Sequence, residues 1–117
     1  MIKLVACLRR LPGMDKAAFH HYWRHTHGPL VMSVTEFSRH VRKYVQGHTV
    51  YDPAPGFPPP TEPLYDGVAE LWFDDLEAIG KAFAEPRYME IIRPDELKFL
   101  DLSNCRMTLV EEAPIYG

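Results

Sequence analysis

The chain of 117 residues has little of what several protein classes require. It has only two cysteines, Cys7 and Cys105, which lie near opposite ends and lack the Cys-x-x-Cys spacing of metal and redox sites. We interpret both as reduced packing residues of a cytoplasmic protein, because disulfides persist mainly in oxidising compartments. No apolar run approaches the roughly 20 residues that span a bilayer, and the first ten residues indicate a strand rather than a signal peptide. No membrane partner is therefore expected.

Positive charge is also sparse. The 13 Lys and Arg against 16 Asp and Glu give a formal net charge of −3, and the basic residues gather only at Arg9-Arg10 and residues 39–43. Binding to a phosphate backbone needs a basic stripe, so a nucleic-acid partner is not expected. The hydrophobic fraction of 46% is that of a globular protein, and the length suits one domain with a real core. We expect a single domain over residues 1–117.

Motifs for cofactors and nucleophiles are missing as well. There is no GxGxxG or GxxxxGK[ST] loop for a dinucleotide or nucleotide, and no HExxH for a metal. His20, His25 and His27 are close in sequence, but on a helix His25 points away from the other two. Neither Ser33 nor Cys7 lies in a nucleophile elbow. We therefore expect no dinucleotide or nucleotide cofactor and no metal.

Residues 14–32 hold four of the six histidines and predict a helix. Asp15 is a suitable N-cap, and Gly28-Pro29 is a suitable end, because glycine permits a left-handed cap and proline disfavours helix before it. A step of about 100° per residue places five residues on one core-facing arc: Phe19, Tyr22, Trp23, Thr26 and Leu30. His20 and His27 fall together on its flank, partly desolvated, whereas His21 and His25 face solvent.

The rest of the chain predicts strands and two further helical segments. Residues 2–9, 41–51, 67–73 and 106–112 have the β-branched and aromatic content of strands. A helix follows the Asp74-Asp75 cap with Leu76, Ile79 and Phe83 on one face and ends at Glu85-Pro86. A weaker helical pattern over residues 87–101 is broken at Arg93-Pro94. Residues 52–66, with six prolines, form a loop that is a candidate lid or arm. The order is that of a ferredoxin-like βαββαβ fold in the α+β class, with an antiparallel sheet.

Both faces of the predicted sheet carry apolar residues. One set is Val5, Cys7, Val68, Trp72, Met107 and Leu109, and the other is Leu4, Leu8, Leu71, Phe73 and Val110. Helices cover only one face of such a sheet, so the other needs a second cover. A second copy of the chain is the simplest one, and we expect a homodimer.

General acid–base chemistry needs only what is present. Tyr44, Gln46 and His48 project from one face of their strand, and a histidine can exchange a proton near neutral pH. We take His27, His48, Tyr44 and Tyr22 as candidate catalytic residues. The candidate substrate contacts are Trp23, Trp72, Gln46, His20 and Glu70. Flat aromatic walls suit an aromatic, polyketide-like or lactone substrate. We expect the dehydration or isomerisation of a small hydrophobic ketone, phenol or lactone.

The segment from His20 to Leu30 resembles the signature of the EthD domain family, and three further stretches agree in order: residues 44–48, 66–73 and 95–99. This resemblance implies a dimeric α+β barrel without a bound organic cofactor. It also implies dehydratase, isomerase or cofactor-free monooxygenase chemistry. A non-catalytic protein that shelters an aromatic intermediate remains the alternative from another class.

Overall fold

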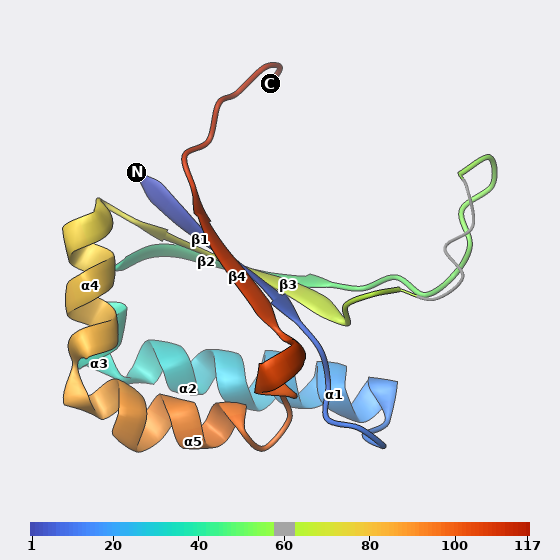
Figure 1. Cartoon of the computed structure of the whole chain (residues 1–117), viewed down its shortest axis with the longest axis horizontal. Helices are drawn as coiled ribbons and strands as arrows, with labels where there is room; N and C mark the ends of the chain where they lie inside the picture. Colours follow the sequence, from blue (N-terminus) through green and yellow to red (C-terminus); the bar gives the residue numbers. More distant parts are fainter. Residues whose placement is uncertain (58–62) are drawn as a thin grey trace.

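The computed structural model describes residues 1–57 and 63–117, and it contains a four-stranded antiparallel sheet with helices on one side (Figure 1). The strands are β1 (Ile2–Leu8), β2 (Val41–His48), β3 (Gly67–Phe73) and β4 (Arg106–Val110), in the order β2-β3-β1-β4. The expected ferredoxin-like arrangement is confirmed. Hydrophobic β1 and β3 lie at the centre, where both edges of each strand are hydrogen-bonded.

Side-chain alternation divides the sheet into an inner face, which meets the helices, and an outer face. Leu4, Leu8 and Leu71 are buried on the inner face, as the period of two requires. The register of β4 corrects one assignment. Leu109 pairs with Leu4 and Met107 with Ala6, so both belong to the inner face. Val110 pairs with Lys3 and belongs to the outer face, the reverse of the expectation.

The histidine-rich helix begins as expected but does not end at Gly28-Pro29. Asp15 accepts a hydrogen bond from the Ala18 N–H at the start of α1 (Lys16–Tyr22). The wider turn η1 (Trp23–His27) and the helix α2 (Gly28–Ser33) then continue the same rod, followed by α3 (Thr35–Ser38). Gly28 is right-handed helical, with φ of −56°, and bonds to the Trp23 carbonyl five residues back. Pro29 has no N–H, and in a regular α-helical turn its ring would clash with the carbonyl four residues back. The wide turn leaves room for the ring.

This extra residue in the turn also changes which side chains face the core. Phe19 and Trp23 are fully buried, as expected, but Thr26 is exposed and His27 is buried instead. His21 and His25 are exposed, as expected. His20 and His27 do not lie together, contrary to expectation. His20 lies beside His48, whereas His27 lies beside Asp95.

The second helical region repeats this design. Asp75 caps α4 (Leu76–Ala84), which packs Ile79, Ala82 and Phe83 inward and leaves Leu76 exposed, contrary to expectation. The turn η2 (Tyr88–Ile92) and α5 (Arg93–Glu96) follow, then the short helix η3 (Leu102–Asn104). The expected break at Arg93-Pro94 is absent, because the Arg93 N–H reaches back to the Tyr88 carbonyl through a second wide turn.

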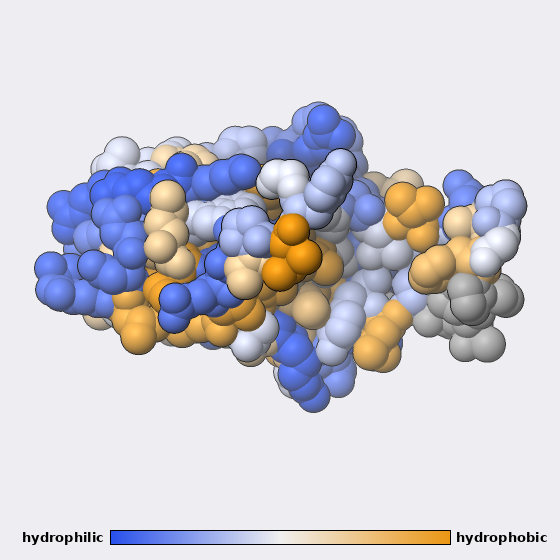
Figure 2. All heavy atoms as spheres, turned by 90° about the horizontal axis from the view of Figure 1, so that it is seen from above, coloured by the Kyte–Doolittle hydropathy of each residue, from blue (hydrophilic) through white to orange (hydrophobic). Residues whose placement is uncertain are grey.

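The outer face is more polar than expected. Lys3 lies between Glu70 and Glu112, at 2.7 and 3.4 Å, and the ammonium groups of Lys3 and Lys43 lie over the Trp72 ring. Figure 2, seen from above this side, shows hydrophobic residues among strongly hydrophilic ones. The described ends of the proline-rich loop project beyond the sheet (Figure 1), whereas residues 58–62 of that prediction lie outside the described residues.

Two further properties concern the described residues. Cys7 and Cys105 are free thiols. No helix among residues 1–57 and 63–117 is long and apolar enough to cross a membrane.

Candidate active site

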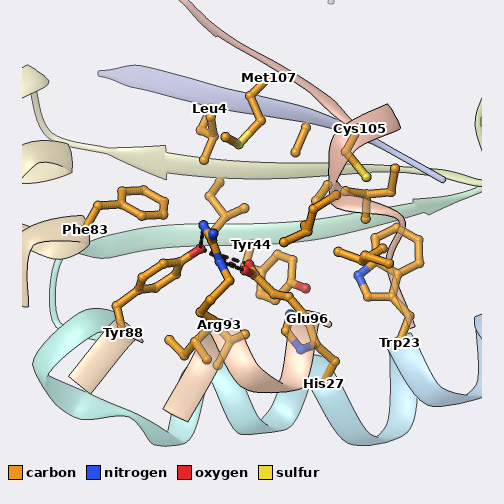
Figure 3. A pocket seen from close by; sticks show the side chains of 18 of the residues that line it. Leu4, Trp23, His27, Tyr44, Phe83, Tyr88, Arg93, Glu96, Cys105 and Met107 are labelled. Atoms are coloured by element: carbon orange, nitrogen blue, oxygen red, sulfur yellow. Dashed lines mark hydrogen bonds and ion pairs between the residues drawn. The ribbon is translucent and has the colours of Figure 1, made fainter. Parts of the chain in front are cut away.

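A cavity of about 310 Å³ lies between the inner face of the sheet and the helices (Figure 3). Its wall is mostly apolar and comes from all layers of the fold: Leu4, Ala6, Leu8, Trp23, Val31, Phe37, Ala69, Leu71, Phe83, Ile92, Phe99, Leu100, Leu102, Cys105 and Met107. Five polar side chains also reach it: His27, Tyr44, Tyr88, Arg93 and Glu96. A largely apolar cavity with a few polar groups is the usual form of a small-molecule site.

His27 and Asp95 form a buried pair at this cavity. The Asp95 carboxylate Oδ2 lies 2.8 Å from His27 Nδ1, and both residues are 5% exposed. A carboxylate can only accept here, so the Nδ1 of His27 carries hydrogen and the neutral ring has its lone pair on Nε2. The ring packs on Phe99, with centroids 4.8 Å apart.

The Nε2 of His27 is the ring nitrogen that Asp95 leaves free, and it belongs to a residue that lines the cavity. Among the described residues, every fully buried side-chain nitrogen or oxygen has a hydrogen-bond partner. The Nε2 of His27 has none, so it retains open surface, and the cavity is the space that His27 lines. A base of this kind, with its other nitrogen held by a carboxylate, is suited to abstract a proton.

Asp95 is itself held by a second donor. The Tyr22 hydroxyl donates to its other oxygen, Oδ1, and the Lys98 ammonium lies 3.7 Å from that oxygen. Burial, the hydrogen bond to Asp95 and the negative charge of that residue raise the pKa of Tyr22 to about 12. Tyr22 therefore stays protonated near neutral pH and remains a donor.

A second polar group runs along β2. The Gln46 side-chain amide donates from Nε2 to the Trp23 carbonyl and to the Tyr44 hydroxyl, at 2.9 Å each. The Nε2 of His48 lies 2.9 Å from Gln46 Oε1. Burial raises the pKa of Tyr44, which keeps its hydroxyl protonated. Of these β2 residues, only Tyr44 lines the cavity.

His48 continues this group toward the base of the proline-rich loop. Its Nδ1 lies 2.7 Å from His20 Nδ1, and His20 Nε2 lies 3.0 Å from the Tyr51 hydroxyl. Tyr51 donates to Asp66, which also accepts from the backbone N–H and guanidinium of Arg10. Partial burial lowers the pKa of both His20 and His48.

A third polar group completes the wall. The Tyr88 hydroxyl donates to Glu96, and Arg93 Nε lies 2.7 Å from Glu96 Oε1. Burial and the negative charge of Glu96 raise the pKa of Tyr88 to about 12. Figure 3 shows the side chains of Tyr88, Arg93 and Glu96 meeting in the cavity, joined by the dashed lines of these contacts.

The structure brings only some of the sequence candidates to the cavity. His27, Tyr44 and Trp23 line it directly. Gln46, His48 and His20 form a chain of contacts that starts at Tyr44 and does not itself line the cavity. Tyr22 does not line it either and bonds to Asp95, the partner of His27. Glu70 and Trp72 alternate with Ala69 and Leu71 and lie on the outer face, away from the cavity.

Sequence reasoning missed Asp95, Glu96, Arg93 and Tyr88. Asp95 lies 68 positions from His27 in the sequence, and a single Asp in a helical pattern is normally expected to be exposed to solvent. The one available signal was the match of residues 95–99 to the EthD pattern. Among the described residues, no group of three His, Cys, Asp or Glu side chains is arranged to hold a metal ion.

Comparison with known families agrees with this geometry. The EthD domain model matches residues 11–103, which include the histidine-rich helix, β2, β3 and Asp95. This chain belongs to the EthD family. A solved EthD family protein from Bacillus halodurans superposes with a TM-score of 0.70 at 23% identity, covering 97% of this chain and 99% of the other. A dimeric protein of unknown function with a ferredoxin-like fold, from Bacteroides fragilis, has a TM-score of 0.62 at 10% identity and covers 95% of each chain.

Two curated relatives in fungi carry names that state an activity. The conidial pigment biosynthesis dehydratase EthD of Metarhizium robertsii is 33% identical over 110 residues, 86% of this chain and 74% of the relative. The dehydratase aurZ of Gibberella zeae is 24% identical over 115 residues, 93% of this chain and 75% of the relative.

Proposed function

We propose that this EthD protein is a cofactor-free dehydratase that removes water from a β-hydroxyketone fused to an aromatic ring. The observation that carries the proposal is the buried His27–Asp95 pair, at 2.8 Å, in which His27 lines an apolar cavity that Tyr44 also lines. The dehydratase names of the two fungal relatives support the reaction class. The alternative of an isomerase would use the same proton transfers without loss of water.

In the proposed reaction, His27 moves one proton. Its Nε2 takes a hydrogen from the carbon next to the carbonyl, whose oxygen accepts a hydrogen bond from Tyr44 as the enolate forms. The C–O bond at the β-carbon then breaks, and the protonated His27 returns its proton to the departing hydroxyl, which leaves as water. Asp95 stabilises the imidazolium between these steps, and the transfer needs no oxidant or reductant.

The cavity supports an aromatic substrate. Its volume of about 310 Å³ is at the lower end of the range for small-molecule sites, and its lining is apolar apart from the five polar groups. Trp23 and Phe99 supply flat surfaces beside His27. Loss of water that extends a conjugated ring fits such walls.

The test uses 3-hydroxy-1-tetralone, which loses water to give fluorescent 1-naphthol. We expect turnover by the wild-type protein, and a fall in kcat of about 10²–10⁴-fold in His27→Ala and in Asp95→Asn. The matched control is His21→Ala, on the same helix but exposed, which should keep full activity with an unchanged circular dichroism spectrum. Full activity in His27→Ala would show that His27 is not the base.

Two other outcomes would replace the proposal. Binding of 1-naphthol without turnover of any β-hydroxyketone would favour a protein that shelters an aromatic intermediate. Oxygen uptake with an aromatic substrate would favour a cofactor-free monooxygenase.

We also propose that two copies associate through the outer faces of their sheets. That face carries Val5, Cys7 and Val68, which remain half-buried in the single chain, and no helix of the described residues covers it (Figure 1). The dimeric protein from Bacteroides fragilis shares the fold. Light scattering after size exclusion should give about twice the 13.5 kDa chain mass, and Val68→Glu should halve it. A wild-type monomer at micromolar concentration would contradict this proposal.

A further inference from the structure

The hydrogen bonds along β2 have a direction that one backbone group decides. The Trp23 carbonyl can only accept, so the Gln46 atom 2.9 Å from it must be the amide nitrogen. The same nitrogen lies 2.9 Å from the Tyr44 oxygen and donates to it as well. That hydroxyl therefore receives a hydrogen bond from Gln46, and its own hydrogen remains available for a partner in the cavity that Tyr44 lines.

We propose that Gln46 and His48 are positioning residues that make Tyr44 a hydrogen-bond donor to the substrate carbonyl, and that neither touches the substrate. This inference rests on the proposed dehydratase function. Gln46 directs the Tyr44 hydroxyl, and His48 fixes Gln46 by donating from its Nε2 to Oε1, 2.9 Å away. His48 is thereby reassigned from direct acid–base work to the support of Tyr44.

The packing around both side chains agrees with this role. Both ring nitrogens of His48 are occupied, by Gln46 and by His20, and neither Gln46 nor His48 lines the cavity. The ring of His48 packs on Trp23 with centroids 4.5 Å apart. At Gly28, a Cβ would lie 2.8 Å from the Gln46 amide nitrogen, so only glycine leaves the amide in this place.

The experiment compares two replacements of Gln46 that have a similar shape. Gln46→Glu places acceptors where the amide donated, so at pH 8 the Tyr44 hydroxyl must donate to the new carboxylate and turn away from the cavity. Gln46→Met removes all three hydrogen bonds of the Gln46 side chain and leaves the Tyr44 hydrogen free. Each variant is compared with Tyr44→Phe in turnover of 3-hydroxy-1-tetralone and in the infrared carbonyl band of bound 1-tetralone.

We expect Tyr44→Phe and Gln46→Glu to lower kcat equally, by about 10²–10³-fold, with KM little changed and no further loss in the double variant. Gln46→Met should lose only about 3–10-fold. The carbonyl band should lie at lower wavenumber in the wild-type complex than in buffer, and this shift should vanish in Tyr44→Phe and Gln46→Glu. His48→Gln retains a donor and should keep kcat within about threefold, whereas His48→Leu should resemble Gln46→Met.

The outcomes separate the two proposals. A Tyr44→Phe complex that keeps the band shift, or a wild-type protein that produces none, would overturn the role of Tyr44 and with it the proposed reaction. A shift lost in Tyr44→Phe but kept in Gln46→Glu would overturn only the positioning role of Gln46. Loss of turnover in His48→Gln with the band shift intact would return His48 to direct catalysis.

Discussion

Replacing Gly67 by alanine tests why the site needs glycine at the start of β3. A Cβ at Gly67 would lie 2.4 Å from Trp23 Cζ3, 2.7 Å from Cη2 and 3.2 Å from the Gly47 carbonyl oxygen. Trp23 is 1% exposed and packs against Phe19 and His48, so its rigid ring cannot move aside without displacing neighbours. The contact must be relieved by a shift of the strand or of the helix.

The expected cost follows from this geometry. Overpacking by a methyl group typically destabilises a core by about 1–3 kcal/mol. Two ring atoms inside 3 Å place Gly67→Ala at the upper end, at about 3 kcal/mol. For a domain of this size, about 4 °C per kcal/mol is expected, so the melting temperature should fall by about 12 °C.

The assay is thermal unfolding followed by circular dichroism, with Gly80→Ala as the matched control. Gly80 lies inside α4 with nothing within 4 Å of its Cβ position, so alanine there should stabilise the protein by about 0.5–1 kcal/mol. A Gly67→Ala protein that melts within about 2 °C of wild type would refute the close approach of Trp23 and Gly67.

Three further substitutions test separate parts of the structure. Gly28→Ala should change the melting temperature little, because the Gln46 side chain can shift, but it should lower kcat about as much as Gln46→Met; an unchanged kcat would contradict the contact. Thr26→Ala should alter the free energy of unfolding by less than about 0.5 kcal/mol, since Thr26 is exposed, and a larger loss in urea titration would place it in the core. Asp66→Asn should cost about 1.5–3 kcal/mol at pH 7. Burial alone would raise the pKa of Asp66, but hydrogen bonds from Arg10 and Tyr51 outweigh it and lower that pKa below 3.8. The stability that the Asp66 carboxylate contributes is therefore fully present above pH 3.8. It is lost as the pH falls through the lower folded value. Urea titrations should therefore show the two proteins converging at acid pH, and a difference that grows toward acid would reverse the sign of this argument.

Much of the fold could be predicted from local pattern. The period of two placed Tyr44, Gln46 and His48 on one face of β2, and the structure connects these side chains through hydrogen bonds. The bounds of β3 match the expected strand. Such features depend on residues a few positions apart, where the geometry of a strand is fixed.

Features that depend on distant segments could not be predicted. Nothing near Asp95 in the sequence indicates that its carboxylate meets His27, because that contact arises only when α5 packs beside α2 (Figure 1). The side of β4 that faces the helices follows from its pairing with β1, and a one-residue difference in register moved Met107 and Leu109 to the other face.

The His27–Asp95 pair depends on two irregular helical turns, and a proline accounts for each of them. Each wide turn comes directly before a dipeptide that ends in proline, Gly28-Pro29 after η1 and Arg93-Pro94 after η2. A proline ring clashes with the carbonyl four residues back, and a turn with one extra residue moves that carbonyl aside while the helix continues. The extra residue rotates everything after it by about 100° relative to a regular helix. His27, at the end of the first wide turn, is buried while Thr26 is exposed, and Asp95 follows the second wide turn by three positions. A sequence read with a uniform helical step therefore places Thr26 where His27 lies, and the two prolines that predict helix ends are what bring the histidine and its carboxylate together.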